Sequence, residues 1–171
     1  MRPAPWHTRS LPNGLGMEQL PVLLARVRGT PVRMQEVLRS VRPEQLALHR
    51  SGEWGVLEHL AHLTHLQDRL MARVDDLEAR RPDLCPIDLA DQVSVLTHVH
   101  TRHPGDVLEE FRLRRLAFVQ RVQRMPDAVL AHVARHPCGE RPTRVIDMLL
   151  WVAEHDDHHL AHIHHLLGAG R

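Results

Sequence analysis

Apolar residues recur every three or four positions along most of this 171-residue chain, and this spacing constrains the fold more than any other feature. It matches one face of an α-helix, whereas the alternation of β-branched and aromatic residues that marks strands is absent. Four long segments carry the pattern: about Met17 to Ser40, from after Trp54 to Arg80, Asp106 to Arg124, and Arg144 to Leu167. Four helices of this length predict an all-α protein, a four-helix bundle around one core.

Local signals mark where these helices begin and break. The segment Gly29-Thr30-Pro31 interrupts the first helix, so we expect a kink or break there, with Thr30 capping the second half. Gly55 is a tolerable N-cap for the second helix, and Glu58 stands at the capping-box position. Asp106 and Thr143 are the caps that we expect for the third and fourth helices.

Two long connectors shape the expected topology. They lie between the second and third helices, where a short helix near Ile87 to Thr97 is expected, and between Met125 and Pro142. Each is long enough to cross an end of the bundle, so simple up-down-up-down order is not required. We expect residues 1–16 to form an N-terminal arm, either poorly ordered or packed on a neighbour, and residues 17–171 to form a single bundle domain with long crossover connections.

Composition excludes several classes of function. The formal net charge of +1 gives no reason to expect nucleic acid as a partner. All 22 basic residues are arginine and there is no tyrosine, which excludes a Schiff-base lysine, a P-loop lysine and a tyrosine general acid. No apolar run approaches the roughly 20 residues that cross a bilayer, so no membrane partner is expected. Without a secretory signal, Cys85 and Cys138 are expected as free thiols in a reducing cytoplasm, although a disulfide between them is an alternative.

Histidine is the anomaly in the composition. The chain has 16 histidines, and six of them fall between His155 and His165. His155 and His159 occupy the stripe of the fourth helix that otherwise carries valine and leucine toward the core. An i, i+4 pair places two imidazoles about one turn apart on the same face, where both can reach one ion. On the second helix, His62 lies beside the core stripe, and His59, three residues earlier, falls at an adjacent position around the helix.

Buried neutral imidazoles are unfavourable unless each finds a partner. A divalent ion supplies that partner, and metal sites in helical bundles are built from side chains on facing helices. The alternative is that these are core histidines bonded to backbone carbonyls or water. An i, i+4 pair with a third inward histidine on another helix favours a metal site formed by His62, His155 and His159.

Two motifs carry a resemblance to a known family. Trp54 to Leu63 reads W-x-x-x-E-x-x-x-H-L, and His155 to Ile163 reads H-D-D-H-H-L-A-H-I. Together, in this order and at this separation, they resemble the two signatures of the DinB/YfiT-like superfamily, and the likeness covers nearly the whole chain. Three positions depart from the family pattern: Gly55 replaces the usual serine or threonine, His65 a frequent aspartate, and His162 a common glutamine.

The resemblance implies a four-helix bundle with a long crossover, one divalent metal ion on His62, His155 and His159, and a homodimer. It implies a metal-dependent enzyme acting on a small molecule, with a low-molecular-weight-thiol S-transferase first, the thiol being a cosubstrate. The alternatives are a metal-dependent hydrolase and a non-catalytic, stress-related metal-binding bundle. Imidazole ligands suit Zn, Ni and Fe, with Mn less favoured. No catalytic residue beyond the ligands is assigned.

Other polar residues have simpler explanations than a role in the site. We expect Glu58 to serve as a cap rather than as an acid or base. We expect Asp156 and Asp157 to be solvated, with a role in orienting an imidazole as the alternative. We also expect Arg112 and Arg115 to lie in solvent at the bundle edge, with anchoring of a substrate carboxylate as the alternative. The remaining histidines of the fourth helix are expected to be solvated, with binding of a second ion as the alternative: His158, His162, His164 and His165. Trp54 and Trp151 are expected to be packing anchors.

Overall fold

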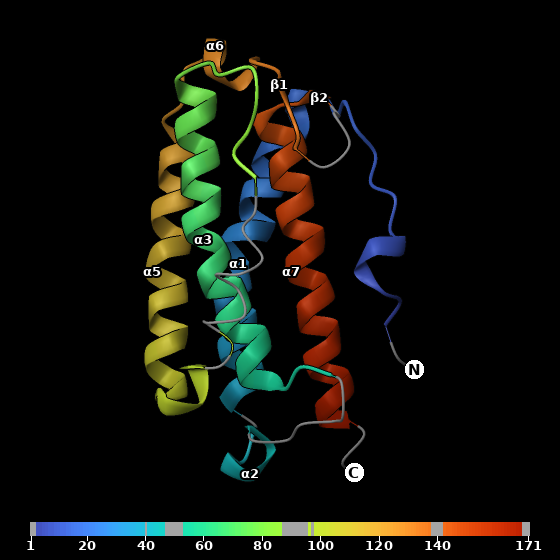
Figure 1. Ribbon diagram of the computed structural model, residues 1–171, viewed down its shortest axis with the longest axis vertical. Helices are drawn as coiled ribbons and strands as arrows, with labels where there is room; N and C mark the ends of the chain where they lie inside the picture. Colours follow the sequence, from blue (N-terminus) through green and yellow to red (C-terminus); the bar gives the residue numbers. More distant parts are fainter. Residues whose placement is uncertain are drawn as a thin grey trace.

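The computed structural model describes residues 3–39, 41–46, 53–86, 96, 98–137 and 142–168. Four long helices run side by side and enclose the core (Figure 1): Leu20–Arg39 (α1), Val56–Glu78 (α3), Pro104–Gln123 (α5) and Val145–Gly168 (α7). The predicted all-α four-helix bundle is therefore confirmed. None of the helices in the described ranges is long and apolar enough to span a membrane.

The helices do not alternate in direction along the chain. In Figure 1, α1 and α7 run downward and α3 and α5 run upward, and each of α1 and α3 packs against both α5 and α7. Because α3 and α5 run in the same direction, the connection between them joins opposite ends of the bundle. This connection ends in a 3-10 turn, Val99–Thr101 (η3), and the short helix expected near residues 87–97 falls almost wholly outside the described residues.

The described residues of the second connector lie at one end of the bundle. This connector contains a short helix, Asp127–Leu130 (α6), and two strands, Ala134–Arg135 (β1) and Pro142–Thr143 (β2), which pair antiparallel. Another short helix, Pro43–Leu46 (α2), lies at the opposite end, between α1 and α3. The parallel α3–α5 pair therefore accounts for the long crossover that we expected. Cys138 lies outside the described residues, and Cys85 is a free, half-buried thiol.

The expected break in the first helix does not occur. Helix α1 continues through Pro31, and a short 3-10 turn, Met17–Gln19 (η2), precedes it. Proline has no N–H to donate to the residue four positions earlier, which leaves the Val27 carbonyl without its helical partner. The Arg115 guanidinium on α5 donates to that carbonyl at 3.2 Å. Thr30 does not cap a helix, and its hydroxyl bonds to Asp156 instead.

Two of the three other predicted helix starts need correction. The capping box is confirmed, because the Glu58 carboxylate accepts from the Gly55 N–H at 2.5 Å. Helix α5 begins earlier than Asp106, with Nδ1 of His103 accepting from the Gly105 N–H at 3.1 Å. At the start of α7 the carboxylate of Asp147 accepts from the Arg144 N–H, whereas Thr143 lies in β2.

The apolar core falls into two parts along the bundle. One part joins the beginning of α1, the end of α3, the end of α5 and the beginning of α7, and the other joins the opposite halves of the same helices. Between them α7 carries four buried polar residues, His155, Asp156, His158 and His159. The site described below lies in this middle zone.

The N-terminal arm lies along α7 (Figure 1). Asn13 donates to the carbonyl of Pro142, the Gly14 N–H donates to Asp147, and Arg144 donates to the carbonyl of Leu15. These bonds hold the base of the arm to the beginning of α7. Toward its tip, a 3-10 turn, Trp6–Thr8 (η1), places Trp6 against the middle of the same helix.

Candidate metal centre

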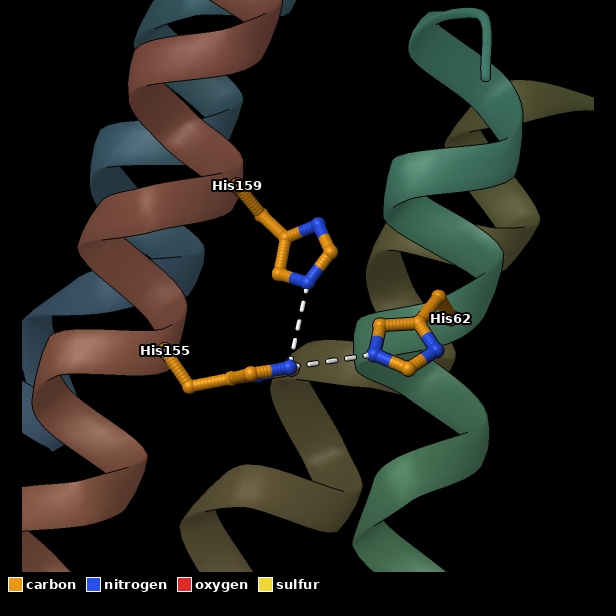
Figure 2. Close-up of side chains that lie close together, drawn as sticks. All are labelled: His62, His155 and His159. Carbon is orange, nitrogen blue, oxygen red and sulfur yellow. Dashed lines mark hydrogen bonds between the residues drawn. The ribbon is translucent and has the colours of Figure 1, made fainter. Parts of the chain in front are cut away.

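The structure brings together the three histidines that the sequence singles out. His155 and His159 lie one turn apart on α7, and His62 faces them from α3 (Figure 2). The Nε2 atom of His155 is 3.3 Å from Nε2 of His62 and 3.2 Å from Nε2 of His159. Tetrahedral coordination with metal–nitrogen bonds of about 2.0–2.1 Å separates ligand atoms by roughly 3.3 Å. The spacing of these donors therefore fits a single divalent ion.

Burial keeps all three imidazoles neutral. His155 and His159 are only 6% and 5% exposed, and His62 is half-buried. Loss of solvation lowers the pKa of His155 and of His159 well below the usual value, and neighbouring imidazoles lower both further. The pKa of His62 is lowered to about 4, mainly by burial and then by His65. A neutral imidazole offers the lone pair that a metal ion needs.

Indole rings surround these histidines. The chain has three tryptophans, and all three contact the site. Trp151 stacks on the ring of His155 with centroids 4.6 Å apart, and Trp6 meets the same ring edge-on at 5.0 Å. Trp54 packs against the rings of His62 and His159. Trp54 and Trp151 are thus packing anchors, as expected, but what they pack on is the site itself.

His59 is a site residue that sequence reasoning did not select. It is 6% exposed, and its Nδ1 lies 2.8 Å from Nδ1 of His159. Burial, with neighbouring imidazoles adding to it, lowers the pKa of His59 to about 3. The available signal was its spacing of three residues from His62, one turn earlier on the same helix.

The remaining histidines of α7 differ in environment. His158 is buried against Trp6 and the ring of His162, so the expectation that it is solvated is wrong. His164 is exposed, and His162 and His165 are half-buried. Within the described ranges, the only group of three or more candidate ligands whose donor atoms all lie within 4.8 Å of one another is His62, His155 and His159. The alternative of a second ion on the C-terminal histidines gains no support from this geometry.

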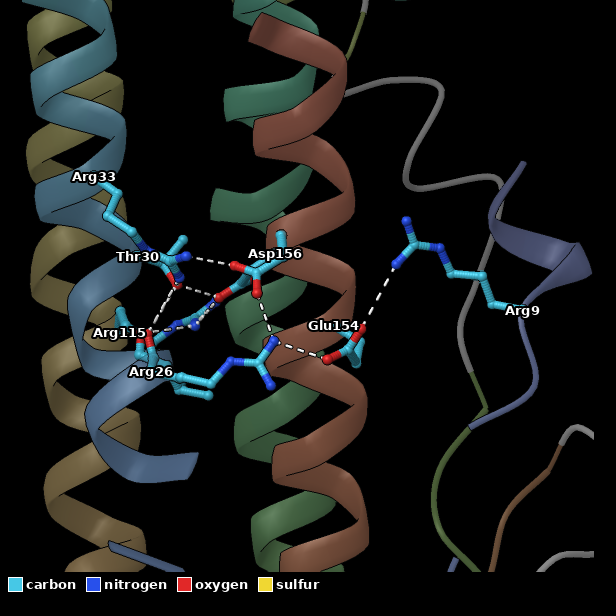
Figure 3. Close-up of polar contacts among 9 residues, drawn as sticks. Arg9, Arg26, Thr30, Arg33, Arg115, Glu154 and Asp156 are labelled. Atoms are coloured by element: carbon cyan, nitrogen blue, oxygen red, sulfur yellow. Dashed lines mark hydrogen bonds and ion pairs between the residues drawn. The ribbon is translucent and has the colours of Figure 1, made fainter. Parts of the chain in front are cut away.

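Asp156 and Arg115 are buried, contrary to expectation. Their side chains are 0% and 1% exposed and form a two-pronged ion pair, with distances of 2.5 and 3.0 Å (Figure 3). Thr30 donates to the same carboxylate at 2.7 Å, and the Gln67 amide oxygen accepts from Arg115 at 2.9 Å. We call Thr30, Gln67, Arg115 and Asp156 the arginine–aspartate cluster. Its polar groups are turned to one another, which leaves Arg115 no role as an anchor for a substrate carboxylate.

The neighbouring charges lie at the surface. Asp157 is half-buried and pairs with Arg26 and Arg33 of α1 at 2.5 Å each, so it is not simply solvated. Arg112 is exposed and bonds to Glu109 on its own helix, as a surface arginine does. The pairs of Asp157 with Arg26 and Arg33 hold the outer face of α7 to α1 without reaching the histidines.

The fold and the site together define a class, a four-helix bundle with three convergent histidines at its centre. A family model of the DinB superfamily matches residues 26–163, and the chain belongs to this superfamily. The resemblance noted from the two motifs is thereby confirmed. No curated protein matches the chain in sequence.

Two solved structures share the fold. YfiT from Bacillus subtilis, described as "a probable metal-dependent hydrolase with an unusual four-helix bundle topology", superposes with a TM-score of 0.82 at 19% identity, covering 95% of this chain and 93% of YfiT. A mycothiol-dependent maleylpyruvate isomerase superposes with a TM-score of 0.70 at 11% identity, covering 87% of this chain and 61% of the isomerase. At these identities the likeness establishes the fold and no more.

Proposed function

We propose that this protein is a metal-dependent enzyme that transfers a low-molecular-weight thiol to a small electrophile, with one divalent ion held by His62, His155 and His159. The observation that carries the proposal is the convergence of three Nε2 atoms from buried, neutral rings at the spacing of one coordination sphere. Zn, Ni and Fe suit such nitrogen ligands best.

A divalent ion held by the three histidines would keep a coordination position open, where it would bind a thiolate or an activated water at neutral pH. The chain's own residues provide the surroundings. The rings of Trp6, Trp54 and Trp151 keep bulk water from the imidazoles, which strengthens charge interactions at the site. The arginine–aspartate cluster holds α7 in the rotation that turns His155 and His159 toward α3.

Hydrolysis is the second candidate, and the description of YfiT as a probable metal-dependent hydrolase favours it. The thiol reaction is placed first because another protein of this fold is a mycothiol-dependent isomerase. A non-catalytic, stress-related bundle is the third. We also propose a homodimer that works in the cytoplasm.

The test begins with metal analysis of protein purified without added metal. The same protein is then assayed with mycothiol and glutathione against an activated haloarene, and with water against nitrophenyl esters. Thiol conjugation that disappears in His155→Ala would support the transferase, and ester cleavage without thiol would support the hydrolase. Metal binding with neither activity would favour the non-catalytic bundle. Retention of both metal and activity by His155→Ala would refute the ligand assignment.

A further inference from the structure

The two nitrogens of His159 face different neighbours. Its Nε2 atom points to the convergence of the triad, 3.2 Å from Nε2 of His155. Its Nδ1 atom lies 2.8 Å from Nδ1 of His59, which comes from α3. His59 therefore touches a proposed ligand at the nitrogen that the metal does not use.

This contact selects one tautomer of His159. An imidazole that gives the Nε2 lone pair to a metal ion carries its hydrogen on Nδ1. In His159 that N–H has an acceptor at Nδ1 of His59, which must then carry its own hydrogen on Nε2. Both rings are buried, so water does not compete for the bond.

The second α7 ligand is held in another way. Nδ1 of His155 is buried and has no hydrogen-bond partner among the residues that the structure describes. Its ring is fixed by stacking on Trp151, with an angle of 12° between the planes. Stacking restricts the orientation of the ring but does not choose between tautomers, whereas a hydrogen bond from His159 to His59 does both.

We propose that His59 is a positioning residue of the metal centre, which accepts the Nδ1–H of His159 and so presents the Nε2 lone pair of His159 to the ion. The inference rests on the proposed metal site. Trp54 supports the arrangement, since its ring packs against His59 and lies parallel to that of His159. Metal-bound histidines commonly have such a partner, and its loss typically lowers metal affinity 10- to 100-fold.

The experiment compares two replacements of His59 in the full-length chain. Leucine removes the acceptor, whereas asparagine keeps an oxygen near the position of Nδ1. Affinity for Zn²⁺ is measured by competition with a chelator, and His159→Ala marks the loss of a ligand. His164→Leu, an exposed histidine on α7, is the matched control for the change of residue type. We expect His59→Leu to bind Zn²⁺ about 10- to 100-fold more weakly than the wild type, with His59→Asn and His164→Leu staying near it.

A second measurement separates positioning from folding. In metal-free protein, long-range ¹H–¹⁵N spectra report the tautomer of each histidine. We expect His159 to be protonated at Nδ1 in the wild type and in His59→Asn, and to be mixed in His59→Leu. If His59→Leu fails to fold, His59→Ala removes the acceptor without adding bulk.

Each outcome bears on the inference. Wild-type affinity in His59→Leu or His59→Ala, or an equal loss in His59→Asn and His59→Leu, would overturn it while the proposed metal site stands. A wild-type protein that binds neither Zn²⁺, Ni²⁺ nor Co²⁺ would overturn both. Weaker binding in His59→Leu, with recovery in His59→Asn and a matching change of tautomer, supports it.

Discussion

Two consecutive residues of α7 belong to two buried polar clusters that differ in the kinds of group they combine. Asp156 bonds to Thr30 of α1 and Arg115 of α5 in the arginine–aspartate cluster, and His155 meets His62 of α3 in the histidine triad (Figures 2 and 3). Both occupy the zone between the two apolar parts of the core. The first cluster is satisfied by partners within the protein, whereas the second directs three like nitrogen atoms toward one another.

The arginine–aspartate cluster is complementary within itself. The Asp156 carboxylate accepts from Arg115 and Thr30, and Arg115 also donates to Gln67 and to the carbonyl that Pro31 frees in α1. The buried positive charge meets the buried negative charge, which is the condition under which an ion pair is tolerated in a core. Such a cluster ties α1, α3, α5 and α7 together and leaves no group to offer a ligand.

The histidine triad repeats one kind of group. Its three Nε2 atoms face one another, and no carboxylate of the described residues bonds to any of the three rings. Neutral imidazoles can share protons in part, but only a positive ion uses all three lone pairs at once. The triad therefore repeats one donor type, whereas the arginine–aspartate cluster pairs donors with acceptors and opposite charges.

Asp156→Ala should have the largest effect on folding. It leaves the Arg115 guanidinium buried without its counter-charge, and breaking a buried pair in this way costs about 3–5 kcal/mol in the free energy of unfolding. Urea denaturation of metal-free protein measures the loss. The matched control is Asp157→Ala next to it on α7, where the partially exposed ion pairs contribute about 0.2–1 kcal/mol.

The double variant Arg115→Met/Asp156→Leu sharpens this test. It removes both charges and fills the space with apolar atoms, so most of the lost free energy should return. An Asp156→Ala variant no less stable than Asp157→Ala would show that the cluster does not hold the fold.

Metal addition should have the next largest effect, and only through the triad. Zn²⁺ at one hundred times its dissociation constant stabilises a protein by about 2.7 kcal/mol if it binds the folded state alone. In a domain of this length, each added kcal/mol of stability raises the melting temperature by about 2–4 °C. His155→Ala should lose the shift, and Asp157→Ala should keep it. Equal shifts in wild type and His155→Ala would place the ion elsewhere.

The sequence was sufficient to predict the helices and the triad. Helical periodicity follows from local burial, and the i, i+4 spacing of His155 and His159 requires only that α7 be a helix. His62 could be added because its position beside Leu63 and Leu66 sets its phase on α3. The parallel order of α3 and α5 was not predicted, because a long connector is compatible with several paths.

Contacts between helices were the part that could not be predicted. Asp156 was expected in solvent because its partner Arg115 stands 41 residues away on another helix, and no local pattern reports such a pairing. The contact of His59 with His159 could not be predicted for the same reason, since the two residues are 100 positions apart. Where a side chain lies slightly off the core stripe, only the packing of the neighbouring helix decides whether it is buried.

Acidification should destabilise the metal-free protein through the histidines. Burial lowers the pKa of His62 from 6.5 in the unfolded chain to about 4 in the folded one. Between these values the unfolded chain binds a proton that the folded chain does not, so stability falls as the pH falls. Each such proton contributes at most about 1.4 kcal/mol per pH unit.

Urea denaturation at several pH values, with a chelator present, measures this slope. We expect His62→Leu to lower it by about one proton between pH 6 and pH 5. His164→Leu, at an exposed position of α7, is the control for the change of residue type. An unaltered slope in His62→Leu would show that His62 is not a source of the acid sensitivity.

Arg9→Ala should have the smallest effect, and it tests whether the arm serves the fold or the site. Arg9 lies 3.7 Å from Glu154, with side chains 29% and 28% exposed, and near the ring of Trp6. A pair of this kind contributes about 0.2–1 kcal/mol and weakens with salt. Because Trp6 stays in contact with His155 through its ring, we expect a slight, salt-sensitive fall in melting temperature and unchanged Zn²⁺ affinity. A clear fall in Zn²⁺ affinity in Arg9→Ala would mean that the ion pair, rather than the indole, keeps the arm on the histidines.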